Sequence, residues 1–184
     1  MSKIKPKESF KDILERQGFS TELCIVTGTI GVTCYNRRGK QKWTDLSKNV
    51  IVNSGKNYLL NAAFAGVTPI TDWYIGLINN TPTPTLAVTN TMSSGTRNWA
   101  EITSDYDESS RPVWNVTTTS SQTMTNSTTA DFTFNGSITV YGIFITSDSS
   151  KGGESGTLWS AGAFSSARSV INGDVLKVTY TASM

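Results

Sequence analysis

The sequence predicts a mainly β protein: an antiparallel β-sandwich, jelly-roll-like, with one short helix near residues 54–65 and a short N-terminal helical arm. Composition is the first reason, because 23 Ser and 27 Thr fill 50 of the 184 positions. Thr favours the half-buried surface of a sheet, and Ser favours turns. The second reason is that six or seven short apolar runs alternate with turn signals. Charged residues make up only 16% of the chain, against roughly 25% in an average domain.

Two parts are expected: an arm over residues 1–20 and a single sandwich domain over residues 21–184. In the arm, Phe10, Ile13 and Leu14 have the spacing of one apolar helical stripe. A helix this short is not stable alone. It therefore needs to pack on the sandwich or on another subunit.

A basic hairpin is expected over residues 30–46. Ile30, Val32 and Cys34 alternate with smaller residues, and residues 36–39 form a turn in which glycine can take a positive φ. Basic side chains gather at the tip of this hairpin: Arg37, Arg38, Lys40 and Lys42.

The strongest helix signal covers residues 54–65. Asn53 or Ser54 can cap the helix, and Gly66 followed by Pro69 predicts its end. Its apolar positions predict one buried face, made of Leu59, Leu60, Ala63 and Phe64.

From residue 72 onward the pattern is that of strands and loops. Residues 73–78 are apolar on both faces, which predicts a central strand. Residues 79–97 are expected to form a long polar loop. Further strands are expected at residues 99–103, 112–119, 130–134, 138–146, 157–164 and 175–182.

Charge is distributed unevenly along the chain. Residues 1–48 carry ten Lys or Arg against five Asp or Glu, and the remainder carries six against nine, for a total of +2. The basic N-terminal part either seeks an acidic partner or is simply solvated. Nucleic acid is not expected as a partner, because no basic stripe spans the domain.

No signal peptide or membrane span is expected, because no long apolar run follows the basic N-terminus. The chain is therefore expected to be synthesised in the cytoplasm and used without membrane insertion. Cys24 and Cys34 are too few for a disulfide scaffold. Two free thiols are favoured, with pairing across a hairpin as the alternative.

Catalysis is not expected, and neither is a cofactor or a metal. The chain has no histidine, which removes the commonest general base and metal ligand. Asp105, Asp107 and Glu108 lie close together, and a solvated loop is favoured over a cation or partner contact and over a glycosidase pair. Residues 151–156 do not match the Walker pattern, because the lysine precedes the glycines, so a turn is expected there.

Aromatic residues are the remaining candidates for binding: Trp73, Tyr74, Trp99, Trp114 and Trp159. They form either a sugar-binding platform or, as is more common, a core or an oligomer interface.

Several segments together resemble a known family. They are WTD (43–45), NVIVNSGKNYLL (49–60), WYIGL (73–77), WAEI (99–102), YDESSRP (106–112), GIFITS (142–147), KGGESGTL (151–158) and GDVLKVTYT (173–181). Over about residues 40–182 the chain resembles small virion structural proteins of tailed bacteriophages, of the capsid decoration or cement type. The resemblance implies a homo-oligomer, trimer or dimer, on the outer capsid surface. It provides no catalytic residues.

The expected function is therefore a decoration protein that binds the major capsid protein and stabilises the shell by bridging its subunits. The expected contact residues are Lys3, Lys5, Lys7, Phe10, Ile13, Leu14, Arg37 and Arg38. The alternative is a neck or tail fibre, or a host-recognition module that binds a surface glycan near the loops 79–97 and 104–112. A glycan-cleaving enzyme is a third class, supported only by the acidic cluster.

Overall fold

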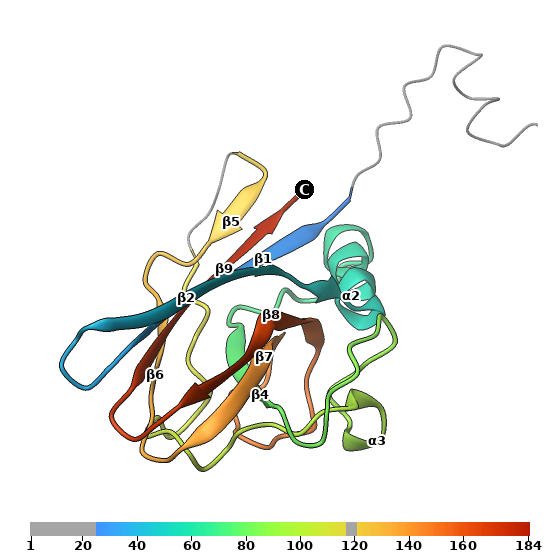
Figure 1. Cartoon of the computed structure of the whole chain (residues 1–184). Coiled ribbons are helices and arrows are strands. Elements are labelled where there is room, and N and C mark those ends of the chain that lie inside the picture. The colour runs from blue at the N-terminus through green and yellow to red at the C-terminus, as the bar shows by residue number, and fades with distance from the viewer. Residues whose placement is uncertain (1–24, 117–120) are drawn as a thin grey trace, which may run out of the picture.

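Two antiparallel sheets face each other in the computed structural model, which describes residues 25–116 and 121–184 (Figure 1). The strands are β1 (Thr27–Tyr35), β2 (Gln41–Lys48), β3 (Val50–Ile51), β4 (Tyr74–Asn79), β5 (Thr123–Thr125), β6 (Ala130–Thr133), β7 (Ile138–Thr146), β8 (Leu158–Val170) and β9 (Val175–Ser183), and the helices are α2 (Asn53–Phe64) and α3 (Ser94–Arg97). One sheet has the order β2-β1-β9-β5, with β6 also paired to β9, and the other has the order β3-β8-β7-β4. The predicted β-sandwich is confirmed.

Alternating side chains build the core between the sheets. In β1, Ile30, Val32 and Cys34 are buried, while their neighbours are at least partly exposed. Leu176 and Val178 of β9 lie in the same core, opposite residues from β4, β7 and β8. The period-two pattern in the sequence therefore marks the inner face of the first sheet correctly.

The outer face of the second sheet is also covered. A second apolar cluster joins Ile78 of β4 and Phe144 of β7 to Met92 and Trp99 of the long loop. This covering explains why β4 is apolar on both faces. The predicted central position is wrong, because β4 is the edge strand of its sheet.

Two of the expected strands are not formed. Residues 99–103 and 112–116 make only isolated bridges, at Glu101 and Val113 with Ile78 and Tyr74 of β4 and at Val116 with Asn126. Residues 117–120 lie outside the described residues. Conversely, β5 and α3 form in segments that the sequence pattern assigned to loops.

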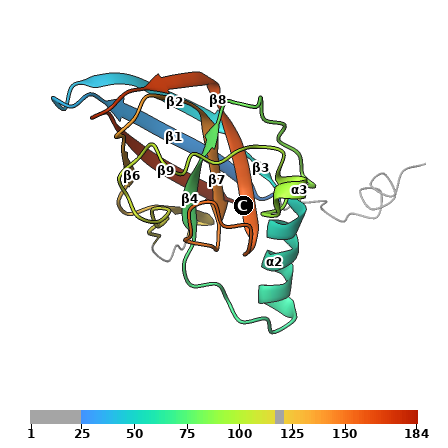
Figure 2. The ribbon, with the colours of Figure 1, turned by 90° about the horizontal axis from the view of Figure 1, so that it is seen from below.

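Helix α2 has nearly the predicted bounds but not the predicted environment. Its N-cap is Val52 without a side-chain hydrogen bond, and the Ser54 hydroxyl instead donates to the Leu158 carbonyl over 2.8 Å. Only Gly55 of this helix is buried. The predicted buried face is wrong, because Leu60 is 57% exposed and Phe64 is 84% exposed. Figure 2 shows the reason: α2 projects away from the sheets instead of lying along them.

The basic hairpin forms as β1 and β2, joined by a turn at residues 36–40. The Asn36 side chain accepts hydrogen bonds from the backbone N–H groups of Arg38 and Lys40, over 2.9 and 3.0 Å. Arg37 and Arg38 are exposed at this turn. Gly39, at φ 74°, takes the positive φ that the turn requires.

Asp45 of β2 fastens the hairpin to the opposite sheet. Its buried carboxylate accepts hydrogen bonds from the backbone and hydroxyl of Ser165 and from Arg168 Nη2, at 2.9 Å. Burial alone would raise the pKa of Asp45, but these hydrogen bonds and the Arg168 charge outweigh it and hold the pKa below its ordinary value. The two sheets are thus linked by an ionised carboxylate.

Cys34 is a free and fully buried thiol. Burial, together with the nearby Asp174 carboxylate, raises the pKa of Cys34 to about 11. Cys24, the arm at residues 1–20 and its expected contact residues lie outside the described residues. No helix in residues 25–116 and 121–184 is long and apolar enough to cross a membrane.

Candidate functional site

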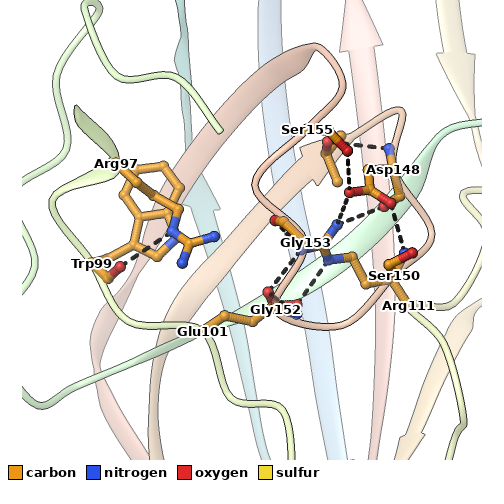
Figure 3. Close-up of polar contacts among 10 residues, drawn as sticks. Arg97, Trp99, Glu101, Arg111, Asp148, Ser150, Gly152, Gly153 and Ser155 are labelled. Atoms are coloured by element: carbon orange, nitrogen blue, oxygen red, sulfur yellow. Dashed lines mark hydrogen bonds and ion pairs between the residues drawn. The ribbon is translucent and has the colours of Figure 1, made fainter. Parts of the chain in front are cut away.

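A fully buried arginine joins loop 101–111 to the loop between β7 and β8 (Figure 3). Arg111 Nε and Nη2 donate to the two carboxylate oxygens of Glu101, each over 2.8 Å. Arg111 Nη1 donates to the Asp148 carbonyl over 2.7 Å, and Nη2 also donates to the Gly153 carbonyl over 3.0 Å. Such paired, charge-assisted bonds are geometrically strict, so loop 101–111 and loop 147–156 are held in one arrangement.

Loop 147–156 is shaped by its own polar groups. Asp148 accepts hydrogen bonds from Ser150 N and Ser155 Oγ, at 2.9 and 3.0 Å. Burial would raise the pKa of Asp148, but these bonds and the Arg111 charge hold it below the ordinary value. Gly152 takes a φ of 72°, and its N–H donates to Glu101 Oε2 over 2.9 Å. The predicted turn is therefore present, and it is anchored through Glu101.

Lys151 fixes the same loop to Tyr106. Its Nζ lies 3.7 Å from the Tyr106 ring centroid and donates to the Tyr106 carbonyl over 3.0 Å. The lysine is thus engaged in a contact between two loops, which fits the turn interpretation of Lys151-Gly152-Gly153.

The acidic cluster also has structural partners. Asp107 accepts from Asn135 Nδ2 over 2.8 Å, and Glu108 accepts from the Thr133 backbone N–H over 3.1 Å. Among residues 25–116 and 121–184, no group of three or more His, Cys, Asp or Glu side chains is placed to hold a metal ion.

A polar pocket of about 590 Å³ opens in the long loop beside α3. Its lining residues are Pro82, Thr83, Thr85, Ser94, Asn98, Trp99 and Ala100. None of these carries a charge. The pocket therefore combines hydroxyl and amide groups with an indole edge, an arrangement that can donate and accept hydrogen bonds but offers no acid or base.

The polar pocket is connected to the buried Arg111 through side-chain contacts. Ser94 Oγ donates to Glu154 Oε2 over 2.8 Å, which lowers the pKa of Glu154. Trp99 packs against Phe144 with ring centroids 5.8 Å apart, and the Arg111 guanidinium lies 5.2 Å from the same ring. Phe144 therefore contacts both Trp99, which lines the pocket, and Arg111.

Two buried donors beside the pocket have no acceptor in the described part of the chain: Trp99 Nε1 and Arg97 Nη1. Figure 3 shows the two side chains next to each other. Within the described residues, the Arg97 side chain makes one long hydrogen bond, from Nε to the Trp99 carbonyl over 3.4 Å. Unpaired buried donors are rare in folded proteins, whereas each guanidinium nitrogen of Arg111 donates a hydrogen bond.

An apolar groove lies between α2 and the ends of β1, β5 and β9. It consists of two adjoining hollows of about 310 and 630 Å³ that share Val26, Leu59, Trp159 and Met184. The other lining residues are Ile25, Lys56, Tyr58, Leu60, Ala63, Phe64, Trp73, Trp114, Gln122, Met124, Ala182 and Ser183.

Two of the indole N–H groups in the apolar groove, those of Trp114 and Trp159, are already bound inside the protein. Trp159 Nε1 donates to the Tyr180 hydroxyl over 2.9 Å, and Trp114 Nε1 donates to the Tyr180 carbonyl over 3.0 Å. These tryptophans therefore offer only apolar surface to the groove. Of the five aromatic candidates, Trp99, Trp114 and Trp159 are core residues, and Trp99 alone also lines the polar pocket.

Sequence reasoning located Arg37 and Arg38 correctly at an exposed tip but missed both concavities and the Arg111 network. The segments that carry the family resemblance contained the signal. Glu101, Arg111 and Gly152 come from three of those segments, and the fold brings them together around one guanidinium group.

A protein-family model described as Podophage GP4 fiber I protein gp80 matches residues 51–183, well over half of the chain. The chain belongs to this family. A comparison with curated proteins gives no match. Membership of the fiber I family confirms the expectation of a structural protein of a tailed-phage virion. It does not support capsid decoration, and it agrees better with the fibre alternative.

The fiber I match includes the polar pocket and the Arg111 network, but not the whole sandwich or the whole apolar groove, which Ile25, Val26 and Met184 also line. It covers α2, the polar pocket and the Arg111 network, whereas β1 and β2 precede it. Since β1 pairs with β9 over its full length, the region outside the match still completes the first sheet.

Proposed function

We propose that this protein is a fibre component of the tailed-phage virion that binds a glycan on the host surface through the polar pocket. The polar pocket beside α3 is the observation that carries the proposal, and the family described as a fibre protein supports the location. Capsid decoration has no comparable support. The exposed Arg37 and Arg38 suit many acidic surfaces and favour neither location.

The pocket has the chemistry that a neutral sugar requires. Sugar hydroxyls both donate and accept hydrogen bonds, as do the side chains of Thr83, Thr85 and Asn98. The Trp99 indole, which lines the pocket, supplies an apolar surface for the C–H groups of a sugar ring. A ligand held in this way is bound without being transformed, because the lining has no general acid or base. The proposal is accordingly for a binding protein, not an enzyme.

Labelling of intact virions tests the location. Antibody against this protein, detected by electron microscopy, is expected to mark fibres and to leave the capsid shell unlabelled. Quantitative mass spectrometry of the same particles is expected to give few copies relative to the major capsid protein. Even labelling of the shell with a high copy number would contradict the fibre assignment and restore the decoration hypothesis.

Removal of two pocket hydroxyls tests the glycan site. The double variant Thr83→Ala, Thr85→Ala is expected to bind purified host polysaccharide roughly fivefold to 150-fold more weakly, since each neutral hydrogen bond contributes about 0.5–1.5 kcal/mol. Both threonines are exposed, so the unfolding midpoint is expected to stay unchanged. Binding is measured by isothermal titration calorimetry or on a polysaccharide-coated surface.

Thr89→Ala is the matched control, because Thr89 is an exposed threonine of the same loop that does not line the pocket. It is expected to bind host polysaccharide as the original protein does. Equal binding by the double variant and the control would contradict the assignment of the pocket.

A further inference from the structure

The apolar groove beside α2 carries several large apolar side chains that are exposed in the described protein. Phe64, Leu60, Met184 and Ile25 line it and are 84, 57, 55 and 54% exposed. Large contiguous apolar patches are rare on soluble proteins and mark places where another apolar surface packs. Lys56 is the one charged residue among those that line the groove. The groove therefore suits an apolar protein segment better than a sugar.

The chain itself offers such a segment at the mouth of the groove. Ile25, the first described residue, lines the groove and is preceded by 24 residues. Among these, Phe10, Ile13 and Leu14 form the apolar stripe of a predicted helix that is too short to be stable alone. Residues 8–17 carry three acidic side chains against two basic ones, Lys11 and Arg16, and this net charge of −1 is complementary to that of Lys56.

The connection is long enough for the stripe to reach any part of the groove. Ten residues separate Leu14 from Ile25 and span up to roughly 33–36 Å when extended. Helix α2 has 12 residues, which corresponds to a length of about 18 Å. A short tether also gives an effective concentration in the millimolar range, so the same chain is favoured over a second copy as the source of the segment.

We propose that residues 8–17 form an amphipathic helix that packs Phe10, Ile13 and Leu14 into the apolar groove of the same chain. This helix would complete the core that α2 leaves open and would cover Leu60 and Phe64. The proposal is independent of the fibre and glycan assignments, because it concerns a different surface and depends on neither.

Disulfide trapping in the full-length protein tests the proposal. The variant Leu14→Cys, Leu60→Cys is made with Cys24→Ser, while the buried Cys34 is retained. Mild oxidation is expected to give an intrachain disulfide, seen as a monomer on a non-reducing gel and assigned by peptide mapping. The matched control replaces Leu60→Cys by Leu46→Cys, since Leu46 is 75% exposed and does not line the groove. The control is expected to form little of this cross-link.

Hydrogen exchange provides a second measurement without cysteines. Leu60→Asp and Phe64→Asp, at exposed positions that should tolerate the change, are each expected to speed amide exchange in residues 8–17 roughly tenfold. Leu46→Asp is expected to leave it unchanged. An interchain disulfide, equal cross-linking in the control, or residues 8–17 exchanging at unprotected rates in the original protein would each overturn the proposal.

Discussion

Replacement of Arg111 by Met is expected to lower the free energy of unfolding by about 3–5 kcal/mol. The change leaves the Glu101 carboxylate, whose side chain is 1% exposed, without its guanidinium partner. It also removes the donor to the Asp148 and Gly153 carbonyls. The free energy of unfolding of a whole domain is only about 5–15 kcal/mol. This single change is therefore expected to remove a large share of the stability of the protein. Urea denaturation followed by tryptophan fluorescence measures it.

Lys177→Met is the matched control, since Lys177 pairs with Asp131 and both side chains are 40% exposed. Exposed ion pairs contribute about 0–1 kcal/mol, so the control is expected to lose no more than that. Similar losses of unfolding free energy in Arg111→Met and Lys177→Met would show that burial of the Arg111–Glu101 pair does not determine its contribution to stability.

Replacement of Gly142 by Ala is expected to cost about 1–3 kcal/mol or more. An added Cβ would lie 2.0 Å from the Gly162 carbonyl oxygen and 2.9 Å from the Ala163 Cα. Both contacts are with the backbone of β8, so neither is relieved by rotation of a side chain. The strands β7 and β8 must separate locally, and thermal unfolding is expected at a lower temperature.

Gly31→Ala is the corresponding control in the other sheet. Its added Cβ would meet nothing closer than the Thr179 Cβ, at 3.8 Å, so the stability is expected to change by no more than about 0.5 kcal/mol. If both substitutions were tolerated equally, the close approach of β7 and β8 at Gly142 would be contradicted.

Local patterns predicted most of the sheets. The alternation in β1, the bounds of β7 and the turn at Gly39 each depend on residues near in sequence, and the structure confirms them. The position of β4 was wrong because an edge strand covered by a loop has the same two-faced apolar pattern as a central one. The predicted burial of one face of α2 was wrong for a similar reason. An apolar stripe indicates that a helix face needs a partner, but it does not indicate where the partner lies.

The candidate sites were harder to predict because they depend on long-range packing. Arg111 meets Gly153 from a different loop, and no local spacing indicates that meeting. The polar pocket is formed by threonines and an asparagine from a segment that looks like an ordinary polar loop. The sequence did indicate the region, since the glycan alternative named loop 79–97, but not which of its side chains converge.

The pairing of β1 with β9 affects the order in which the strand pairs form. Thr27 lies opposite Ser183, and Tyr35 lies opposite Val175. The paired residues of β1 and β9 are therefore separated by about 150 residues in the sequence. Contacts between residues so distant in sequence slow folding. The β1–β9 pairing is therefore expected to form later than the β7–β8 pairing, whose strands are near neighbours in the chain.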